Sequence, residues 1–160
     1  MSAARVQLAV FRVGEQTYAI DIMRVKEVIN PQPVTPVPRA PATLEGVIEL
    51  RGQILPVVDL RKRFDRPASP LTSASKVILV RLPPGGSSFV GLIVDGVREV
   101  VRLPRDEIRP APAMAGQGDA AFFSGVCRLG DEIVMILDID RILSSEERIS
   151  IAGLQEALEK

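Results

Sequence analysis

An internal repeat is the feature that most constrains how this chain folds. In the stretch 46–64, two short apolar runs flank an Arg-Gly-Gln turn at 51–53, and one helical turn is expected at 60–64. This is the pattern of a β-hairpin with a glycine-bearing turn. A shift of 79 positions places Gly46 on Gly125 and continues without a gap. The chain therefore contains one structural unit twice, since a solenoid would need further copies.

A second echo precedes each copy of the hairpin. Residues 19–21 resemble 93–95, and 25–29 resemble 97–101. Alternating or β-branched runs predict strands at 7–13, 17–22, 25–29, 47–50, 54–58, 77–82, 89–94, 97–101 and in the second copy of the hairpin. Many short strands in a duplicated chain favour two small closed barrels, because closure removes exposed strand edges. Barrels of this size have packed interiors, so we expect function on the outside, at the groove between the two units.

The connecting segments have their own signals. Five prolines at 31–41 predict an extended connection, and the Pro/Ser/Thr-rich 65–75 is the expected junction between the halves. A helical turn is expected at 104–108 and a loop at 111–119. A serine three residues before Glu147 forms a capping-box pattern, which predicts a terminal helix.

The composition excludes several functional classes. With 20 Lys and Arg against 20 Asp and Glu, one Tyr and no Trp, the 160-residue chain has little to attract or stack nucleic acid. The single cysteine, Cys127, rules out an intrachain disulfide. The absence of histidine excludes His-based triads and His-ligated metals, and no phosphate-binding loop occurs, so we expect no cofactor. No apolar run reaches transmembrane length, which favours a cytosolic protein that does not insert into membranes.

Paired aspartates are the one enzymatic arrangement to weigh. Asp21, Asp59, Asp95 and Asp138 form two pseudo-equivalent pairs, and aspartic proteases use two carboxylates about 3 Å apart that share a proton. Those proteases place Ser or Thr and then Gly after the aspartate, a pattern that none of these four follows. The alternative is that each aspartate ends a strand and caps the turn that follows. We favour capping and keep an aspartate-dependent enzyme as a remote hypothesis.

Differences between the two copies give a better indication of function. Arg51-Gly52 in the first copy corresponds to Gly130-Asp131 in the second, so Arg51 lies on a turn without a counterpart. Its planar guanidinium suits a carboxylate or a backbone carbonyl of a partner. Glu27, in contrast, has a counterpart in Glu99 and could be a surface charge of the shared fold.

The motifs together resemble the CheW family of bacterial chemotaxis coupling proteins. The resemblance covers roughly residues 8–147, in order and at family spacing. The segments that carry it are Tyr18–Ile22, Val25–Val28, Gly46–Ile48, Leu50–Gly52, Pro56–Arg61, Val94–Val97, Glu107–Pro112, Gly125–Val126 and Leu137–Ile139. Such a set is far more specific than any single motif.

The resemblance implies a fold of mainly β structure. Two pseudo-symmetric, SH3-like, five-stranded β-barrels would pack together, with short helical turns and a C-terminal helix at 146–160. Residues 1–160 would form a single CheW-like domain. Its first barrel would have its approximate core at 16–68 and its second at 76–145, and strands could be exchanged between them.

The resemblance also implies a non-catalytic adaptor. Such a protein couples the cytoplasmic tips of methyl-accepting chemotaxis receptors to the regulatory domain of the histidine kinase CheA, with which the family forms rings. It would be cytoplasmic and recruited to membrane-associated receptor arrays. A coupling module of another chemosensory pathway, such as pilus or gliding motility, is the alternative.

Six positions are assigned to receptor or kinase binding by the resemblance. They are Val25 and Glu27 on the third strand, Gly46 and Arg51 on the hairpin, and Val77 and Val100 near the groove between the barrels. A helical hairpin of a receptor would offer apolar anchors to the valines. The charges of Arg51 and Glu27 would set its register.

Overall fold

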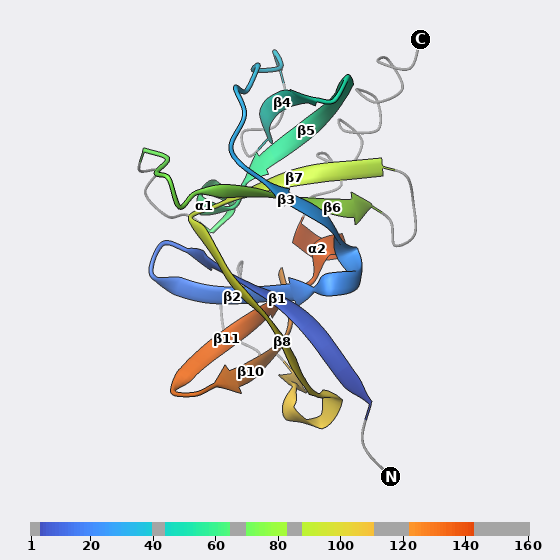
Figure 1. Ribbon diagram of the computed structural model, residues 1–160, viewed down its shortest axis with the longest axis vertical. Coiled ribbons are helices and arrows are strands. Elements are labelled where there is room, and N and C mark those ends of the chain that lie inside the picture. Colours follow the sequence, from blue (N-terminus) through green and yellow to red (C-terminus); the bar gives the residue numbers. More distant parts are fainter. Residues whose placement is uncertain (1–3, 40–43, 65–69, 83–87, 111–121, 143–160) are drawn as a thin grey trace.

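The computed structural model describes residues 4–39, 44–64, 70–82, 88–110 and 122–142, which form two β-sheets (Figure 1). The strands are β1 (Arg5–Val13), β2 (Gln16–Asp21), β3 (Val25–Ile29), β4 (Leu44–Leu50), β5 (Gln53–Asp59), β6 (Lys76–Leu82), β7 (Ser88–Val94), β8 (Gly96–Pro104), β9 (Arg109–Pro110), β10 (Phe123–Leu129) and β11 (Glu132–Leu137). The short helices are η1 (Ile22–Arg24), α1 (Leu60–Arg63), η2 (Arg105–Glu107) and α2 (Ile139–Ile142). The expected loop at 111–119 and terminal helix at 146–160 lie outside the described residues.

The two sheets have the same strand order once the repeat is taken into account. One sheet runs β8-β1-β2-β11-β10-β9 and the other β3-β6-β7-β5-β4. The repeat counterparts of β8, β1, β2, β11 and β10 are β3, β6, β7, β5 and β4, in that order. Apart from the edge strand β9, the two sheets therefore have the same strand order. The parallel pairs β2–β11 and β7–β5 are also equivalent. The duplication read from the sequence is therefore present in three dimensions.

Each half of the chain contributes strands to both sheets. The hairpin β1–β2 joins strands of the second half, and the hairpin β6–β7 joins β3, β4 and β5 of the first half. The chain crosses between the sheets at η1, from β2 to β3, and at Asp95, from β7 to β8. Neither sheet is thus built from 16–68 or from 76–145 alone, and the exact limits of two barrels in this sequence stay a prediction.

Both sheets are closed by the chain in the same way. Strand β8 continues through η2 into β9, whose Arg109 pairs with Val126 of β10. In the other sheet, Thr35, beyond β3, exchanges two backbone hydrogen bonds with Val47 of β4, with N–O distances of 2.8 and 2.9 Å. The short β9 gives one sheet six strands, whereas its counterpart at Thr35 is an isolated bridge.

A glycine permits this closure in each copy. A Cβ on Gly46 would lie 2.1 Å from the carbonyl oxygen of Thr35, and one on Gly125 would lie 2.7 Å from that of Arg109. Gly46 also has a φ of +148°, a conformation that side chains of L-residues rarely adopt. The repeated glycine is therefore required by the close approach of two backbone segments.

Buried apolar side chains of the described residues form three clusters. Two of them are enclosed by one sheet each: the first surrounds Val10 and Val134, and the second surrounds Val57 and Leu79. The third lies between the sheets and takes residues from both. Its centre is aromatic: Tyr18 stacks on Phe64 with ring centroids 4.9 Å apart. Burial of such large rings between the sheets joins both halves into one packed unit.

Candidate functional site

The four aspartates that could have formed a catalytic dyad have structural partners. Asp21 accepts a hydrogen bond from the backbone N–H of Met23 at 2.9 Å, and Asp59 accepts one from that of Arg61 at 2.9 Å. Asp138 accepts one from the N–H of Asp140 at 3.0 Å. These three cap the short helices η1, α1 and α2, so the capping interpretation is confirmed for them.

Asp95 and Asp59 converge on the guanidinium of Arg61 instead of on each other. Arg61 is 6% exposed and donates to both carboxylate oxygens of Asp59, at 3.0 and 2.9 Å. The nearest guanidinium nitrogen lies 3.7 Å from Asp95, which also accepts from the N–H of Gly14 at 2.6 Å. The arrangement neutralises buried charge where the chain passes between the sheets. It is a structural ion cluster.

Arg51 lies at the tip of the β4–β5 hairpin in an unusual backbone conformation. Leu50 pairs with Gln53, which leaves a two-residue turn, and both of its residues have positive φ: +50° at Arg51 and +81° at Gly52. That is the geometry of a type I′ turn, which favours Asn or Gly at the first position. An arginine held at positive φ is uncommon and suggests that its side chain is needed there.

Glu27 of β3 receives the Arg51 side chain. The two guanidinium Nη atoms donate to the two carboxylate oxygens at 2.6 and 3.2 Å, a bidentate pair. The hydrogen bond from Arg51 lowers the pKa of Glu27, and the hydrogen bond to Glu27 raises the pKa of Arg51. The Arg51 side chain is 65% exposed and that of Glu27 is 28% exposed. The pair fixes the hairpin tip over β3 while leaving the guanidinium open to solvent.

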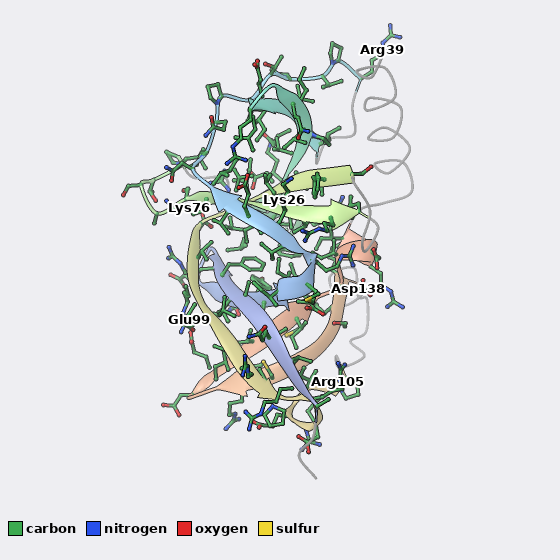
Figure 2. The ribbon with its side chains drawn as sticks, turned by 45° about the vertical axis from the view of Figure 1, so that its right-hand side comes forward. Lys26, Arg39, Lys76, Glu99, Arg105 and Asp138 are labelled. Atoms are coloured by element: carbon green, nitrogen blue, oxygen red, sulfur yellow. The ribbon has the colours of Figure 1, made fainter. Side chains whose placement is uncertain are left out.

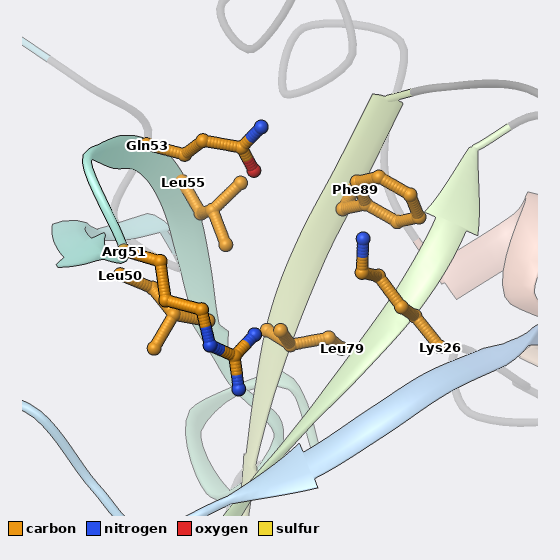
Figure 3. Close-up of a pocket in the computed structure, with 7 residues that line it drawn as sticks. All are labelled: Lys26, Leu50, Arg51, Gln53, Leu55, Leu79 and Phe89. Carbon is orange, nitrogen blue, oxygen red and sulfur yellow. The ribbon is translucent and has the colours of Figure 1, made fainter.

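A hollow of about 220 Å³ lies beside this ion pair, at one end of the five-stranded sheet β3-β6-β7-β5-β4 (Figure 3). Its apolar lining consists of Leu50, Leu55, Leu79 and Phe89, and its polar lining of Lys26, Arg51 and Gln53. The Nζ atom of Lys26 lies 4.2 Å from the centroid of the Phe89 ring, in a cation–π contact. An apolar surface edged by two cations suits a partner that combines an apolar side chain with a carboxylate.

At the equivalent position, the other copy of the repeat has a cluster of polar side chains. The pairing registers place Arg98, Glu132 and Thr17 at the positions of Lys26, Gln53 and Phe89. Arg98 donates to Glu132 at 2.6 Å, and the hydroxyl of Thr17 donates to the same carboxylate at 3.1 Å. The residues that line the hollow in one copy are thus replaced in the other by side chains that bind one another.

The other residues assigned from the sequence have different environments. Val25 is half-buried against the central cluster, and Gly46 is buried at the Thr35 crossing. Val100 of β8 is 55% exposed, on the other sheet. Val77 is 2% exposed and packs inside the second sheet, so its side chain does not reach the surface as expected. A strand valine that faces inward serves packing, which is the commoner role of this residue type.

The structure brings together Arg51 and Glu27, which the sequence had assigned to one surface, and adds residues that it had not. Lys26 and Phe89 line the hollow, yet neither was singled out. The signal was present in the repeat: Lys26 aligns with the ion-paired Arg98, whereas Gln53 replaces the acid that Arg98 binds. Comparing the copies strand by strand would have shown that one polar cluster is absent.

Two further features concern the type of site. No helix within the described residues is long and apolar enough to cross a membrane. Over the same ranges, no group of three or more Cys, Asp or Glu side chains is placed to hold a metal ion.

Comparisons with known proteins identify relatives along most of the chain. The family model of the CheW-like domain matches residues 7–147. The chemotaxis protein CheW of Treponema pallidum is 34% identical over 155 residues, which cover 92% of this chain and 88% of that protein. CheW of Rhizobium meliloti is 35% identical over 142 residues, covering 89% and 90%.

A solved structure gives the same result for the fold. The crystal structure of the scaffolding protein TtCheW from Thermoanaerobacter tengcongensis superposes with a TM-score of 0.80 at 32% sequence identity. The match covers 90% of this chain and 96% of that one. Protein FrzA of Myxococcus xanthus is a further relative, 27% identical over 144 residues that cover 89% of this chain and 88% of FrzA.

Proposed function

This chain belongs to the CheW-like family and is a chemotaxis coupling adaptor, and we propose that it joins a methyl-accepting receptor to the histidine kinase CheA. The receptor partner would be the helical hairpin at the cytoplasmic tip. The kinase partner would be the CheA regulatory domain, in arrays to which the adaptor is recruited from the cytoplasm. The function is one of binding, without a reaction or a cofactor.

The observation that carries the receptor assignment is the Arg51–Glu27 pair beside the hollow. Two guanidinium N–H groups of Arg51 bind Glu27, and a guanidinium has five such donors, so others remain for a carboxylate or carbonyl of a partner. The apolar wall next to it can hold a side chain from one turn of a helix. Val25 and Val100 are proposed as further contacts, and Gly46 as the residue that lets the hairpin approach the preceding segment.

The test is receptor-dependent kinase activity in a reconstituted mixture of receptor, CheA and adaptor. We expect Arg51→Glu to abolish most of the receptor-dependent activity, because the new carboxylate repels Glu27 and removes the donors. Asp131→Arg is the matched control, since it reverses a charge in the equivalent turn of the other copy. Unchanged coupling in Arg51→Glu, with a melting temperature near that of the wild type, would refute the assignment.

Another chemosensory pathway is the second candidate, supported by the similarity to FrzA. Such modules would share the fold and differ in the partner surfaces. Capture of partners from the native cell extract, with wild type and Arg51→Glu in parallel, separates the two. A receptor and a CheA-type kinase of the flagellar system would support the main proposal, whereas a kinase of pilus or gliding motility would support the alternative.

A further inference from the structure

The outer face of β9, β10 and β11 combines exposed apolar and cationic side chains. Arg109 of β9 pairs with Val126 of β10, and Arg128 of β10 pairs with Ile133 of β11. Directly paired residues point to the same side of a sheet, and residues two apart along a strand do so too. Cys127, between Val126 and Arg128, points into the interior cluster. All four paired residues therefore share the outer surface, which we call the arginine face.

The apolar residues of the arginine face are open to solvent. Ile133 is 60% exposed and Val126 is partly exposed. Both arginines are exposed, and within the described ranges neither has a carboxylate at ion-pair distance. Arg105 in the adjoining η2 (Figure 2) is accompanied by the exposed acids Asp106 and Glu107, so the argument rests on the two arginines of the face.

The equivalent face of the other sheet is an internal control. There, Thr35 pairs with Val47, and Glu49 pairs with Ile54, at the positions of Arg109 with Val126 and Arg128 with Ile133. Ile54 is 40% exposed, so the apolar pair is present in both copies. The positive charge is present in only one copy, because a threonine and a glutamate take the places of the two arginines in the other. The apolar residues belong to the repeated fold, whereas the cationic character belongs to one copy.

We infer that the arginine face binds an acidic segment of a protein partner, one that presents an apolar side chain between carboxylates. Each guanidinium can take a carboxylate bidentately, and Ile133 with Val126 covers the apolar side chain. The face lies on a different sheet from Arg51. An adaptor could thus hold one partner at the hairpin and another, chemically different, at this face.

Charge and composition favour an acidic protein segment over nucleic acid or a lipid surface. The net charge of the chain is zero, so long-range attraction to a polyanion is weak. Nucleic acid also needs aromatic rings for stacking, yet none of the four residues that define the arginine face is aromatic. A small apolar surface flanked by two arginines is typical of interfaces between proteins, which have an apolar centre, a polar rim and many arginines.

The test measures binding of a fluorescent peptide of alternating glutamate and leucine by anisotropy. A peptide with lysine in place of glutamate is the control ligand. The loss variant is Arg109→Thr with Arg128→Glu, which gives the face the residues of its counterpart. The gain variant is Thr35→Arg with Glu49→Arg, which transfers the arginines to the other sheet. Thr35 contributes backbone atoms to its bridge, so the substitution preserves those hydrogen bonds.

We expect the wild type to prefer the acidic peptide, the loss variant to bind it about tenfold more weakly or worse, and the gain variant to bind it more tightly. Higher salt should weaken binding by the wild type. Equal binding of both peptides, or an unchanged affinity of a folded loss variant, would overturn the proposal. So would a wild-type dimer that the loss variant dissociates in sedimentation, because the face would then serve a second copy of the chain. Arg51→Glu should leave peptide binding unchanged, which separates this test from that of receptor coupling.

Discussion

Replacing Gly46 by alanine tests the close crossing of two backbone segments that positions the hairpin. The new Cβ would lie 2.1 Å from the carbonyl oxygen and 2.8 Å from the carbonyl carbon of Thr35, far inside ordinary contact distance. Both atoms belong to the backbone, so no side-chain rotation relieves the collision. The segment at Thr35 must retreat, and its two hydrogen bonds to Val47, at 2.8 and 2.9 Å, are lost or weakened.

The expected loss of stability follows from these two effects. The positive φ at Gly46 costs an alanine about 1 kcal/mol or more, and each of the two hydrogen bonds contributes about 1 kcal/mol. We therefore expect the free energy of unfolding to fall by at least about 3 kcal/mol. For a domain of this size, that lowers the melting temperature by roughly 6 to 12 °C.

The assay is thermal unfolding followed by circular dichroism, with Gly52→Ala as the matched control. Gly52 has a φ of +81° and nothing within 4 Å of an added Cβ, so its substitution introduces the backbone strain without the collision. We expect that control to lose about 1 kcal/mol. If Gly46→Ala melted at the same temperature as Gly52→Ala, the steric argument would be refuted, and Gly46 would have to be explained by direct contact with a partner.

The buried ion cluster and the hairpin ion pair give two further predictions. Asp59→Asn removes the charge and one of the two oxygens that hold the buried Arg61, and it should lower the free energy of unfolding by about 3 kcal/mol in urea titrations. Asp138→Ala, which removes a cap without exposing a buried charge, should cost only about 1 kcal/mol, and equal effects of the two substitutions would contradict the assigned role of the cluster. The pKa of Glu27 is lowered in the folded protein by the hydrogen bond from Arg51, so the pair stabilises the fold above the ordinary pKa of 4.5 and is lost as the pH falls through the lowered value. The difference in melting temperature between wild type and Glu27→Gln should therefore be present at neutral pH and shrink as the pH falls below 4.5, and a difference that stays constant would argue against the ion pair.

The hairpin and its repeat were predictable because their signals are local. Alternation of apolar residues around Arg51-Gly52 indicates two strands and a tight turn, and the structure has both. The same logic identified capping by Asp21, Asp59 and Asp138, since a cap needs only the next two residues of the chain. Recurrence of these signals further along the chain was enough to indicate a duplicated β fold.

Residues that act through distant neighbours were less predictable. The family resemblance assigned Val77 to a partner surface, but the residue is buried, and an apolar residue in a strand has the same pattern whether it faces the interior or a partner. Lys26 and Phe89 meet at the hollow because β3 and β7 both pair with β6. No pattern along the chain indicates that these two strands flank the same neighbour.

The sequence by itself determined the repeated unit, its turns and caps, and the arginine that distinguishes one hairpin from the other, because each of these depends on neighbours along the chain. The tertiary structure alone decided that the halves exchange hairpins, that Arg51 reaches Glu27, and that one end of the duplicated fold is hollow while the other holds Arg98 and Glu132. The physical reason is that strand alternation fixes which side chains share one side of a strand, but not which side is buried or which strands become neighbours. That choice depends on how the two sheets bury their shared aromatic core, which only the complete packing determines.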